Sequence, residues 1–314
     1  MKQTTSVILM VRPTHFGFNP ETADSNFYQK QDPRHNDEIQ RLALIEFDGM
    51  VAQLRDQGVE VLVMEDSESP LKTDAIFPNN WLSTHADGKL ILYPMLSPNR
   101  RLERRKEILE QLLRLGFGIS EIIDLSFFEE HGQYLEGTGS MVLDRQAKVI
   151  YAAFSERTHP VPLEYLGQLL GYQMVGFDAK QEVEGKLAPI YHTNVMMHVG
   201  TDIAVVCLES IIKSEERQKV IDSLTKSGKK VIPITARQKF QFAGNMLEVS
   251  NDGGEKFTVM SQAALDSLNV GQIQQIEKYT TIISPAIPTI EKLGGGSVRC
   301  MMAEIFLPRD SGDI

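Results

Sequence analysis

Short apolar segments recur along the chain in a repeating pattern. Segments 81–84 and 89–95 flank an Asp-Gly pair at Asp87 and Gly88. An Asp-Gly pair between apolar runs is typical of a β-hairpin. Three further hairpins with turn residues between apolar segments are predicted at 140–154, 195–208 and 246–260.

A helical pattern follows each hairpin. In 101–115, apolar residues recur at helical spacing and Gly116 ends the pattern. The other predicted helices are 162–170, 214–227 and 261–268, the last continued by 272–278. A short β-branched strand follows each helix, at 122–125, 174–177, 230–234 and 280–284. The chain therefore contains four predicted ββαβ units.

A fifth unit is assembled from the two ends of the chain. Segment 299–306 supplies its first strand, and the N-terminal part supplies a strand at 6–11, a helix at 36–57 and a strand at 60–64. The five first strands begin near residues 81, 140, 195, 246 and 299. Five similar units joined through both termini predict one ring-like α/β domain over residues 1–314, whose closure hides sheet edges. An ordinary α/β sandwich with hairpins is the alternative.

Composition narrows the class of protein. The 314 residues are 42% hydrophobic and carry a net charge of −10, which argues against disorder and against a nucleic-acid-binding protein. The two cysteines provide neither a disulfide framework nor a Cys-rich zinc site, and indicate a reducing compartment. No stretch approaches the ~20 apolar residues of a membrane span. We expect a cytoplasmic protein without nucleic-acid or membrane partners; a homo-oligomer stays open.

Unusual polar residues stand at the start of the first strand in each unit. Asn79 and Asn80 precede Trp81, and Asn245 precedes Met246. In a ring of equivalent units, equivalent positions converge on the axis. The groups expected to line one central pocket, the default active-site hypothesis, are Cys300, His192, Glu136, Asn80 and Asn194.

Each candidate has a structural alternative. Cys207 lies in an apolar segment and is expected to be a buried structural thiol. Cys300 differs because it follows the glycine run 294–296, where backbone can approach a ligand and N–H groups can stabilise a thiolate. His192 and Glu136 could be ordinary polar residues, and the basic run 100–106 is expected to be mostly a solvated helix face. No His, Asp or Glu spacing resembles a metal site.

Five motifs in order resemble the pentein, or amidinotransferase, superfamily, which includes arginine deiminases, dimethylargininases and glycine amidinotransferases. They are Asp-Ala-Ile-Phe-Pro-Asn-Asn at 74–80, Leu-Glu-Gly-Thr-Gly at 135–139, Ser-Glu-Arg-Thr at 155–158, Tyr-His-Thr-Asn at 191–194 and Gly-Gly-Gly-Ser-Val-Arg-Cys at 294–300. The resemblance covers nearly the whole chain. It implies a single catalytic domain with the fold of a five-bladed ββαβ propeller, in agreement with the repeat.

The resemblance also implies roles for individual residues. Cys300 matches the nucleophile, His192 the general acid/base and Glu136 the carboxylate that holds a substrate nitrogen. The positions that match the grip on the amino-acid end of the substrate are Asp74 for the amino group and Arg100 and Arg157 for the α-carboxylate, with Arg101 as an alternative to Arg100. No metal or organic cofactor is implied.

Two departures from the family pattern bear on the substrate. Guanidine-modifying members of the family have a carboxylate at the position of Asn80, and deiminases have another at the position of Asn194. Amides suit a neutral urea, because they can donate to its oxygen and accept from its nitrogens. The hypothesis is hydrolysis of a ureido amino acid, most simply citrulline, as in a citrulline-hydrolase branch of the superfamily. The alternatives are a guanidine-modifying enzyme and a non-catalytic ligand-binding protein on the same fold.

Residues 15–31 show no clear periodicity between a predicted strand and a predicted helix. A loop of this length is often a lid over an active site. A well-packed surface loop is the alternative.

Overall fold

The structure, a computed structural model, describes residues 1–309 of the chain. Within this range the strands form five three-stranded sheets and one two-stranded sheet. The middle strand of every three-stranded sheet pairs antiparallel with one neighbour and parallel with the other. A helix always precedes the parallel strand, so the ββαβ unit predicted from the sequence is confirmed in all five places.

Four sheets are formed by consecutive segments of the chain. Their strands are β3 (Leu82–Thr84), β4 (Lys89–Leu92) and β5 (Glu121–Asp124); β6 (Val142–Asp144), β7 (Val149–Ala153) and β8 (Gln173–Phe177); β11 (Met197–Val199), β12 (Ile203–Val206) and β13 (Lys230–Pro233); and β14 (Leu247–Ser250), β15 (Lys256–Val259) and β16 (Thr281–Ile283). The fifth sheet joins the two ends of the chain as predicted, with β17 (Ala303–Glu304) beside β1 (Val7–Arg12) and β2 (Glu60–Glu65).

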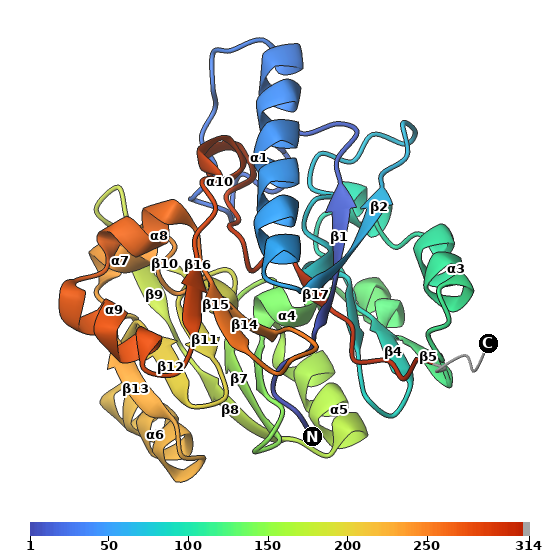
Figure 1. Ribbon diagram of the computed structural model, residues 1–314. Helices are drawn as coiled ribbons and strands as arrows, with labels where there is room; N and C mark the ends of the chain where they lie inside the picture. Colours follow the sequence, from blue (N-terminus) through green and yellow to red (C-terminus); the bar gives the residue numbers. More distant parts are fainter. Residues whose placement is uncertain (310–314) are drawn as a thin grey trace.

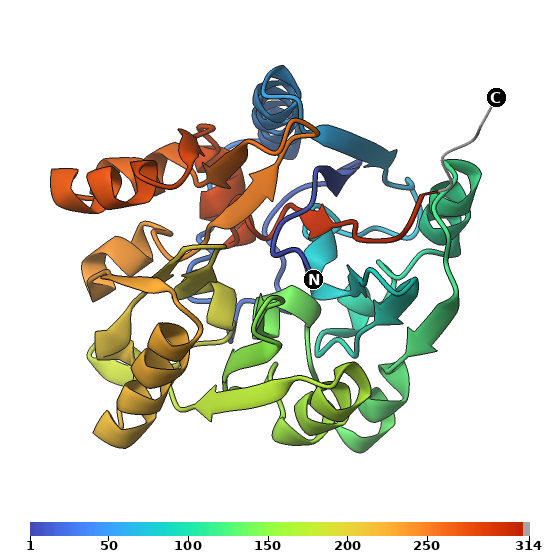
Figure 2. The same cartoon turned by 60° about the horizontal axis from the view of Figure 1, so that its bottom comes forward.

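The helices lie mostly at the outer edge of the molecule, around the sheets (Figures 1 and 2). The main ones are α1 (Asn36–Asp56), α3 (Lys106–Arg114), α5 (Pro160–Leu170), α6 (Ser214–Lys226), α8 (Gln262–Ser267) and α9 (Val270–Glu277). Shorter ones are α2 (Pro98–Arg101), α7 (Ala236–Phe240) and α10 (Pro288–Gly294). Local chemistry sets their ends: α5 has Pro at its first position, where no N–H is needed, and stops at Gly171 with φ 66°.

Three details differ from the sequence-based expectation. The helix predicted at 101–115 is two helices, α2 and α3, and a hairpin of β9 (Lys180–Val183) and β10 (Lys186–Pro189) was not predicted. This hairpin turns at Glu184 and Gly185, which both have positive φ. Among residues 1–309 no strand ladder joins one three-stranded sheet to another, so there is no closed sheet and the expectation of hidden sheet edges is wrong.

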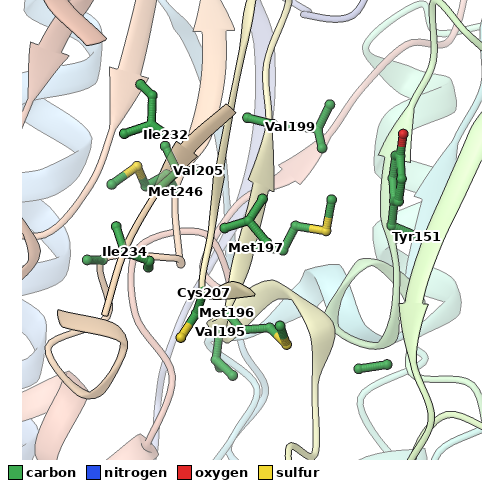
Figure 3. Close-up of a cluster of buried hydrophobic side chains, with 14 of the residues drawn as sticks. Tyr151, Val195, Met196, Met197, Val199, Val205, Cys207, Ile232, Ile234 and Met246 are labelled. Atoms are coloured by element: carbon green, nitrogen blue, oxygen red, sulfur yellow. The ribbon is translucent and has the colours of Figure 1, made fainter. Parts of the chain in front are cut away.

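The hydrophobic core lies between the sheets and their helices. Its largest cluster packs side chains of β7, β11, β12 and β13 together (Figure 3). Cys207 lies in this cluster with no exposed surface, which confirms that it is buried. No helix in the described part of the chain is both long and apolar enough to cross a membrane.

Candidate active site

The candidate site residues come from equivalent places in the five units. Asn80, Asn194, Asn245 and Cys300 each stand two or three residues before the first strand of a unit, and Gly139 holds this position in the second unit. Three of these positions lie in short helical turns, η1 (Pro78–Asn80), α4 (Gly137–Ser140) and η3 (Thr193–Val195). Because of these turns, β3, β6 and β11 begin one or two residues later than predicted from the sequence. The five-fold repeat therefore brings together residues that are far apart in the chain.

A small cavity lies where these turns meet. Six of the eight predicted site residues line it: Asp74, Asn80, Arg100, Arg157, His192 and Cys300. The other two, Glu136 and Asn194, lie one contact deeper, against His192 and Cys300. The wall is completed by Asn26, Phe77, Tyr191, Gly294 and Gly296. No group of three or more His, Cys, Asp or Glu side chains within residues 1–309 could hold a metal ion.

Glycines in two of the motifs allow this close packing. A Cβ on Gly139 would lie 2.3 Å from Nδ2 of Asn80 and 2.8 Å from the ring of His192. A Cβ on Gly294 or Gly296 would lie within 3.0 Å of the Phe77 ring. The glycines after Glu136 and before Cys300 are thus required by the space that their neighbours occupy.

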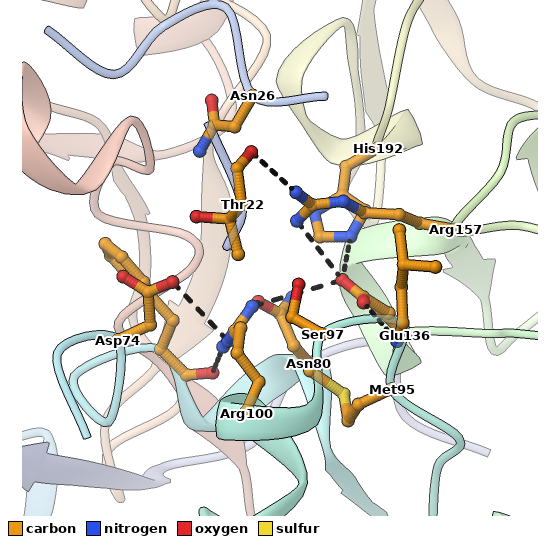
Figure 4. Close-up of polar contacts among 12 residues, drawn as sticks. Thr22, Asn26, Asp74, Asn80, Met95, Ser97, Arg100, Glu136, Arg157 and His192 are labelled. Carbon is orange, nitrogen blue, oxygen red and sulfur yellow. Dashed lines mark hydrogen bonds and ion pairs between the residues drawn. The ribbon is translucent and has the colours of Figure 1, made fainter. Parts of the chain in front are cut away.

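His192 and Glu136 form a buried pair, with Nε2 of His192 2.8 Å from Oε2 of Glu136 (Figure 4). Burial opposes ionisation of Glu136, but the charges of Arg157 and Arg100 and the histidine hydrogen bond outweigh it and lower the pKa of Glu136. Burial lowers the pKa of His192 to about 4, although its bond to Glu136 acts in the opposite direction. At neutral pH the carboxylate therefore accepts from the Nε2–H of a neutral imidazole. Nδ1 is left as the acceptor of the ring.

The thiol of Cys300 faces two side-chain amides. Nδ2 of Asn194 lies 3.5 Å from Sγ, and Nδ2 of Asn245 lies 3.4 Å from it. All three residues are buried. The sulfur is therefore held by neutral N–H donors, and His192 lies on another wall of the same cavity.

Arg100 fixes the orientation of the Asn80 side chain. Its Nη1 donates to Oδ1 of Asn80 over 2.9 Å, and Glu103 holds the guanidinium through two hydrogen bonds of 2.9 Å. Burial raises the pKa of Glu103 to about 7 against the charge of Arg100. Because arginine can only donate, the amide oxygen of Asn80 must face it. The Nδ2 group of Asn80 is left free to donate elsewhere.

Three buried polar atoms of the site have no hydrogen-bond partner in the part of the chain that the structure describes. They are Nδ2 of Asn80, Oδ1 of Asn194 and Oδ1 of Asp74. Burial raises the pKa of Asp74, although Arg100 and a hydrogen bond from Asn19 act against it. Buried polar atoms normally have partners, so unpaired atoms around a cavity indicate where a ligand binds. The site offers one donor and two acceptors.

Residues 15–31, here called the covering segment, contain neither helix nor strand and form part of the cavity wall. Arg157 donates to the carbonyl of Thr22 (Figure 4) and to the Ser25 hydroxyl. Asn26 donates to the carbonyl of Gly294 over 3.1 Å. The segment thus holds one of the two arginines that were predicted to bind a carboxylate. Its movement as a lid stays a prediction.

The basic run at 100–106 departs from the expected solvated helix face. Arg100 is only 3% exposed, whereas Arg101 donates to the carbonyl of Met95 outside the cavity, so Arg100 is the arginine at the site. Arg104 and Arg105 pair with nearby carboxylates. The cause is the break between α2 and α3, which turns the run inward instead of along one helix.

Sequence reasoning left out two residues that contact the site. Asn245 had been singled out by its register but not placed in the pocket, although the same register had found Asn80 and Asn194. Glu103 carried no signal, because an Arg-x-x-Glu spacing is common on exposed helices. Its role depends on burial, which the sequence pattern did not show.

Comparison with known proteins gives one family and several solved structures. Residues 12–307 match the model of a family described as N,N dimethylarginine dimethylhydrolase, eukaryotic. No curated protein sequence matches the chain.

The solved structures share the fold at low sequence identity. The N-terminal domain of ArgZ, a cyanobacterial arginine dihydrolase, is 14% identical with a TM-score of 0.70, covering 95% of this chain and 97% of that domain. AgrE in complex with L-arginine is 15% identical with a TM-score of 0.71, covering 98% of this chain and 41% of that one. A dimethylarginine dimethylaminohydrolase adduct is 14% identical with a TM-score of 0.64, covering 95% of this chain and 99% of that one.

The family match extends over most of the chain, and each of these structural matches covers at least 95% of it. The chain belongs to the eukaryotic N,N-dimethylarginine dimethylhydrolase family, within the pentein superfamily of enzymes that hydrolyse carbon–nitrogen bonds.

Proposed function

We propose that this enzyme hydrolyses a ureido amino acid, most simply citrulline, to ornithine, ammonia and carbon dioxide. One observation carries the proposal: the two asparagines of the site leave one amide donor, Nδ2 of Asn80, and one amide acceptor, Oδ1 of Asn194, without partners among residues 1–309. We further propose that residues 1–314 form a single domain in which the five sheets are the blades of a propeller around this site.

A urea group matches this pair of amides. Its oxygen accepts from Asn80, whose donor is fixed in direction by Arg100, and its nitrogens donate to Asn194. A guanidinium has no acceptor for the Asn80 donor. It would also lose the carboxylates that bind it in guanidine-modifying relatives, and hydrogen bonds to charged groups contribute about 1.5–3 kcal/mol each. The site therefore favours the neutral substrate.

The proposed reaction is a double displacement at the ureido carbon. The Cys300 thiol gives its proton to Nδ1 of His192 as the sulfur attacks this carbon. One carbon–nitrogen bond then breaks, and the departing amine takes that proton back from the imidazolium. The S-carbamoyl intermediate then reacts with water, which gives its proton to Nδ1 of His192. The resulting carbamate releases carbon dioxide and the second amine, so one water is consumed in total. Glu136 stays ionised throughout and balances the imidazolium.

The amino-acid end of the substrate is assigned to the opposite wall of the cavity. Oδ1 of Asp74 is unpaired in the described chain and suits an ammonium group. Arg157 suits the α-carboxylate, because the hydrogen bonds of its guanidinium go to the covering segment. Arg100, the other arginine predicted for this task, already donates to Glu103 and Asn80. We therefore favour Arg157 for this contact.

The test is ammonia release by the purified protein from citrulline, arginine, methylarginine, agmatine and carbamoylputrescine. We expect the highest kcat/KM with citrulline and no release by a Cys300→Ala variant. Release from arginine but not from citrulline would overturn the proposal.

A second candidate is a guanidine hydrolase, which the ionised Glu136 and the family match favour. The double variant Asn80→Asp, Asn194→Asp separates the two. If the natural substrate is a urea, the variant loses citrulline hydrolysis and gains activity on arginine. If the natural substrate is a guanidinium recognised through the amides, the variant loses activity on arginine too.

A further inference from the structure

Asn245 occupies the position in the fourth unit that Asn80 and Asn194 occupy in theirs. It is fully buried and does not line the cavity. Its unit lies in the chain between the unit of Asn194 and the one that carries Cys300. The side chain is therefore placed behind the nucleophile and away from the substrate.

Both ends of the Asn245 amide are engaged. Its Nδ2 donates to the carbonyl of Asn194 over 3.0 Å and lies 3.4 Å from Sγ of Cys300. Its Oδ1 accepts the backbone N–H of Arg299 over 3.0 Å. Since the oxygen is oriented by a backbone donor, the NH2 group is the end nearer to the sulfur, at 3.4 Å against 3.9 Å for Oδ1. One side chain thus connects three segments that meet at the nucleophile.

The backbone before Asn245 is shaped to hold it there. Phe242 has a φ of 60°, a left-handed conformation that a bulky residue rarely adopts. Gly244 packs so closely on the third unit that a Cβ would lie 2.6 Å from the carbonyl oxygen of Val195. Backbone strain of this kind persists only where the surrounding structure enforces it. The segment before Asn245 therefore packs tightly against the backbone at the end of η3.

We propose that Asn245 is a positioning residue for the nucleophile: it stabilises the Cys300 thiolate through its NH2 group and sets the position of the sulfur through the Arg299 backbone. Hydrogen bonds from neutral donors favour the ionised form of a buried thiol. This role is independent of whether the substrate is a urea or a guanidinium, because both ends of the Asn245 amide are already hydrogen-bonded within the protein.

The test compares alkylation of Cys300 by iodoacetamide across pH in wild-type protein and in Asn245→Asp, with the modified peptide identified by mass spectrometry. The aspartate keeps the size of the side chain and the oxygen that accepts from Arg299, but replaces the NH2 donor with an anionic oxygen. We expect the pH midpoint of alkylation to rise by at least one unit, and the rate at pH 7 to fall about tenfold. Asn251→Asp is the matched control, since this half-buried residue lies just beyond the other end of β14.

A purely structural role gives a different result. A negative charge beside the sulfur disfavours the thiolate whatever the role of Asn245, so Asn245→Ala, which removes the NH2 donor without adding a charge, is the decisive variant. If Asn245 only anchors the backbone, Asn245→Ala retains the wild-type midpoint and rate, and the proposal is wrong. Thermal melting of each variant shows whether it is folded. Should the alanine variant not fold, Asn245→Leu, which keeps the size of the side chain, is measured in the same way: a raised midpoint supports the proposal, and an unchanged midpoint overturns it. The readout needs no substrate, so it stays distinct from the test of the proposed reaction.

Discussion

The protein contains two polar cavities that each have a buried histidine and a buried glutamate at or behind their wall. The cavity of the active site contains His192 and Cys300, with Glu136 behind. A second polar cavity is lined by His198 and Glu248, among others, and by Arg299, the residue directly before the nucleophile. Each cavity has a buried histidine and a buried glutamate, so the charges and hydrogen bonds around these two residues are what distinguishes the candidate active site from the second cavity.

Arginine charges are the main difference. Arg157 and Arg100 lie within 4.0 Å of Glu136 and help to lower its pKa, whereas burial raises the pKa of Glu248 against its hydrogen bonds from Thr201. Glu136 also bonds to its histidine, while Oε2 of Glu248 and Nε2 of His198 are unpaired within residues 1–309. The two cavities thus differ in the direction of the pKa shift of their glutamate, and Cys300 lines only the candidate active site.

The strongest test of this difference replaces each glutamate with glutamine. Glu136→Gln removes the charge that orients and balances His192, and we expect kcat to fall about 10³-fold. Glu248→Gln keeps an oxygen for Thr201 and changes no charge near Cys300, so kcat should stay within about twofold of wild type. Steady-state ammonia release on the preferred substrate measures both. Equal losses in the two variants would contradict the comparison.

A second test adds one methyl group to each cavity. Gly139→Ala places a Cβ against Asn80 and His192, and Gly200→Ala places one 2.6 Å from Oε2 of Glu248. Both changes overpack a buried site and should lower the melting temperature. Only Gly139→Ala should lower kcat/KM, by about 100-fold, because small displacements of reacting groups have large effects on rate. Full activity in Gly139→Ala would show that Asn80 and His192 can move without consequence.

The smallest expected effect is on stability at acidic pH. Burial lowers the pKa of His198 to about 3, well below that of an exposed histidine. Between pH 6.5 and 5 the unfolded chain binds a proton at this residue that the folded protein does not, so stability falls as the pH falls. The contribution at pH 5 is about 2 kcal/mol.

The variant His198→Gln removes this proton-linked loss. Urea unfolding at pH 7 and pH 5 should show a smaller difference in the free energy of unfolding than in wild-type protein. His131→Gln, at an exposed histidine, is the control and should behave like wild type. An unchanged difference in His198→Gln would show that this residue is not neutral in the folded state at pH 5.

Much of the fold could be predicted because its signals are local. Turn residues between apolar segments marked the hairpins, and glycines such as Gly171 marked helix ends, so the order of strands and helices is confirmed. The short turns before the first strands escaped prediction because a helical turn of three or four residues is too short to show a periodic pattern. The hairpin of β9 and β10 escaped because its exposed strands lack an apolar pattern.

The candidate site could be predicted as far as the repeat reaches. Register alone grouped Asn80, Asn194 and Cys300, and the structure places them around one cavity or directly behind it. The register of the repeat could not predict which side chains form hydrogen bonds with one another. The hydrogen bonds of Glu103 to Arg100, which orient Asn80, depend on a buried turn that follows a helix break.

The crowding around Gly139 has a consequence for how such a protein can be built from repeats. Where the five units meet, the Asn80 amide and the His192 ring already fill the volume that a side chain at position 139 would occupy. Five identical copies of one sequence therefore could not meet here with the same bulky residue in each. The five units must therefore differ in sequence at the positions where they meet. Gly139, in the second unit, has no side chain and so leaves space for those of Asn80 and His192.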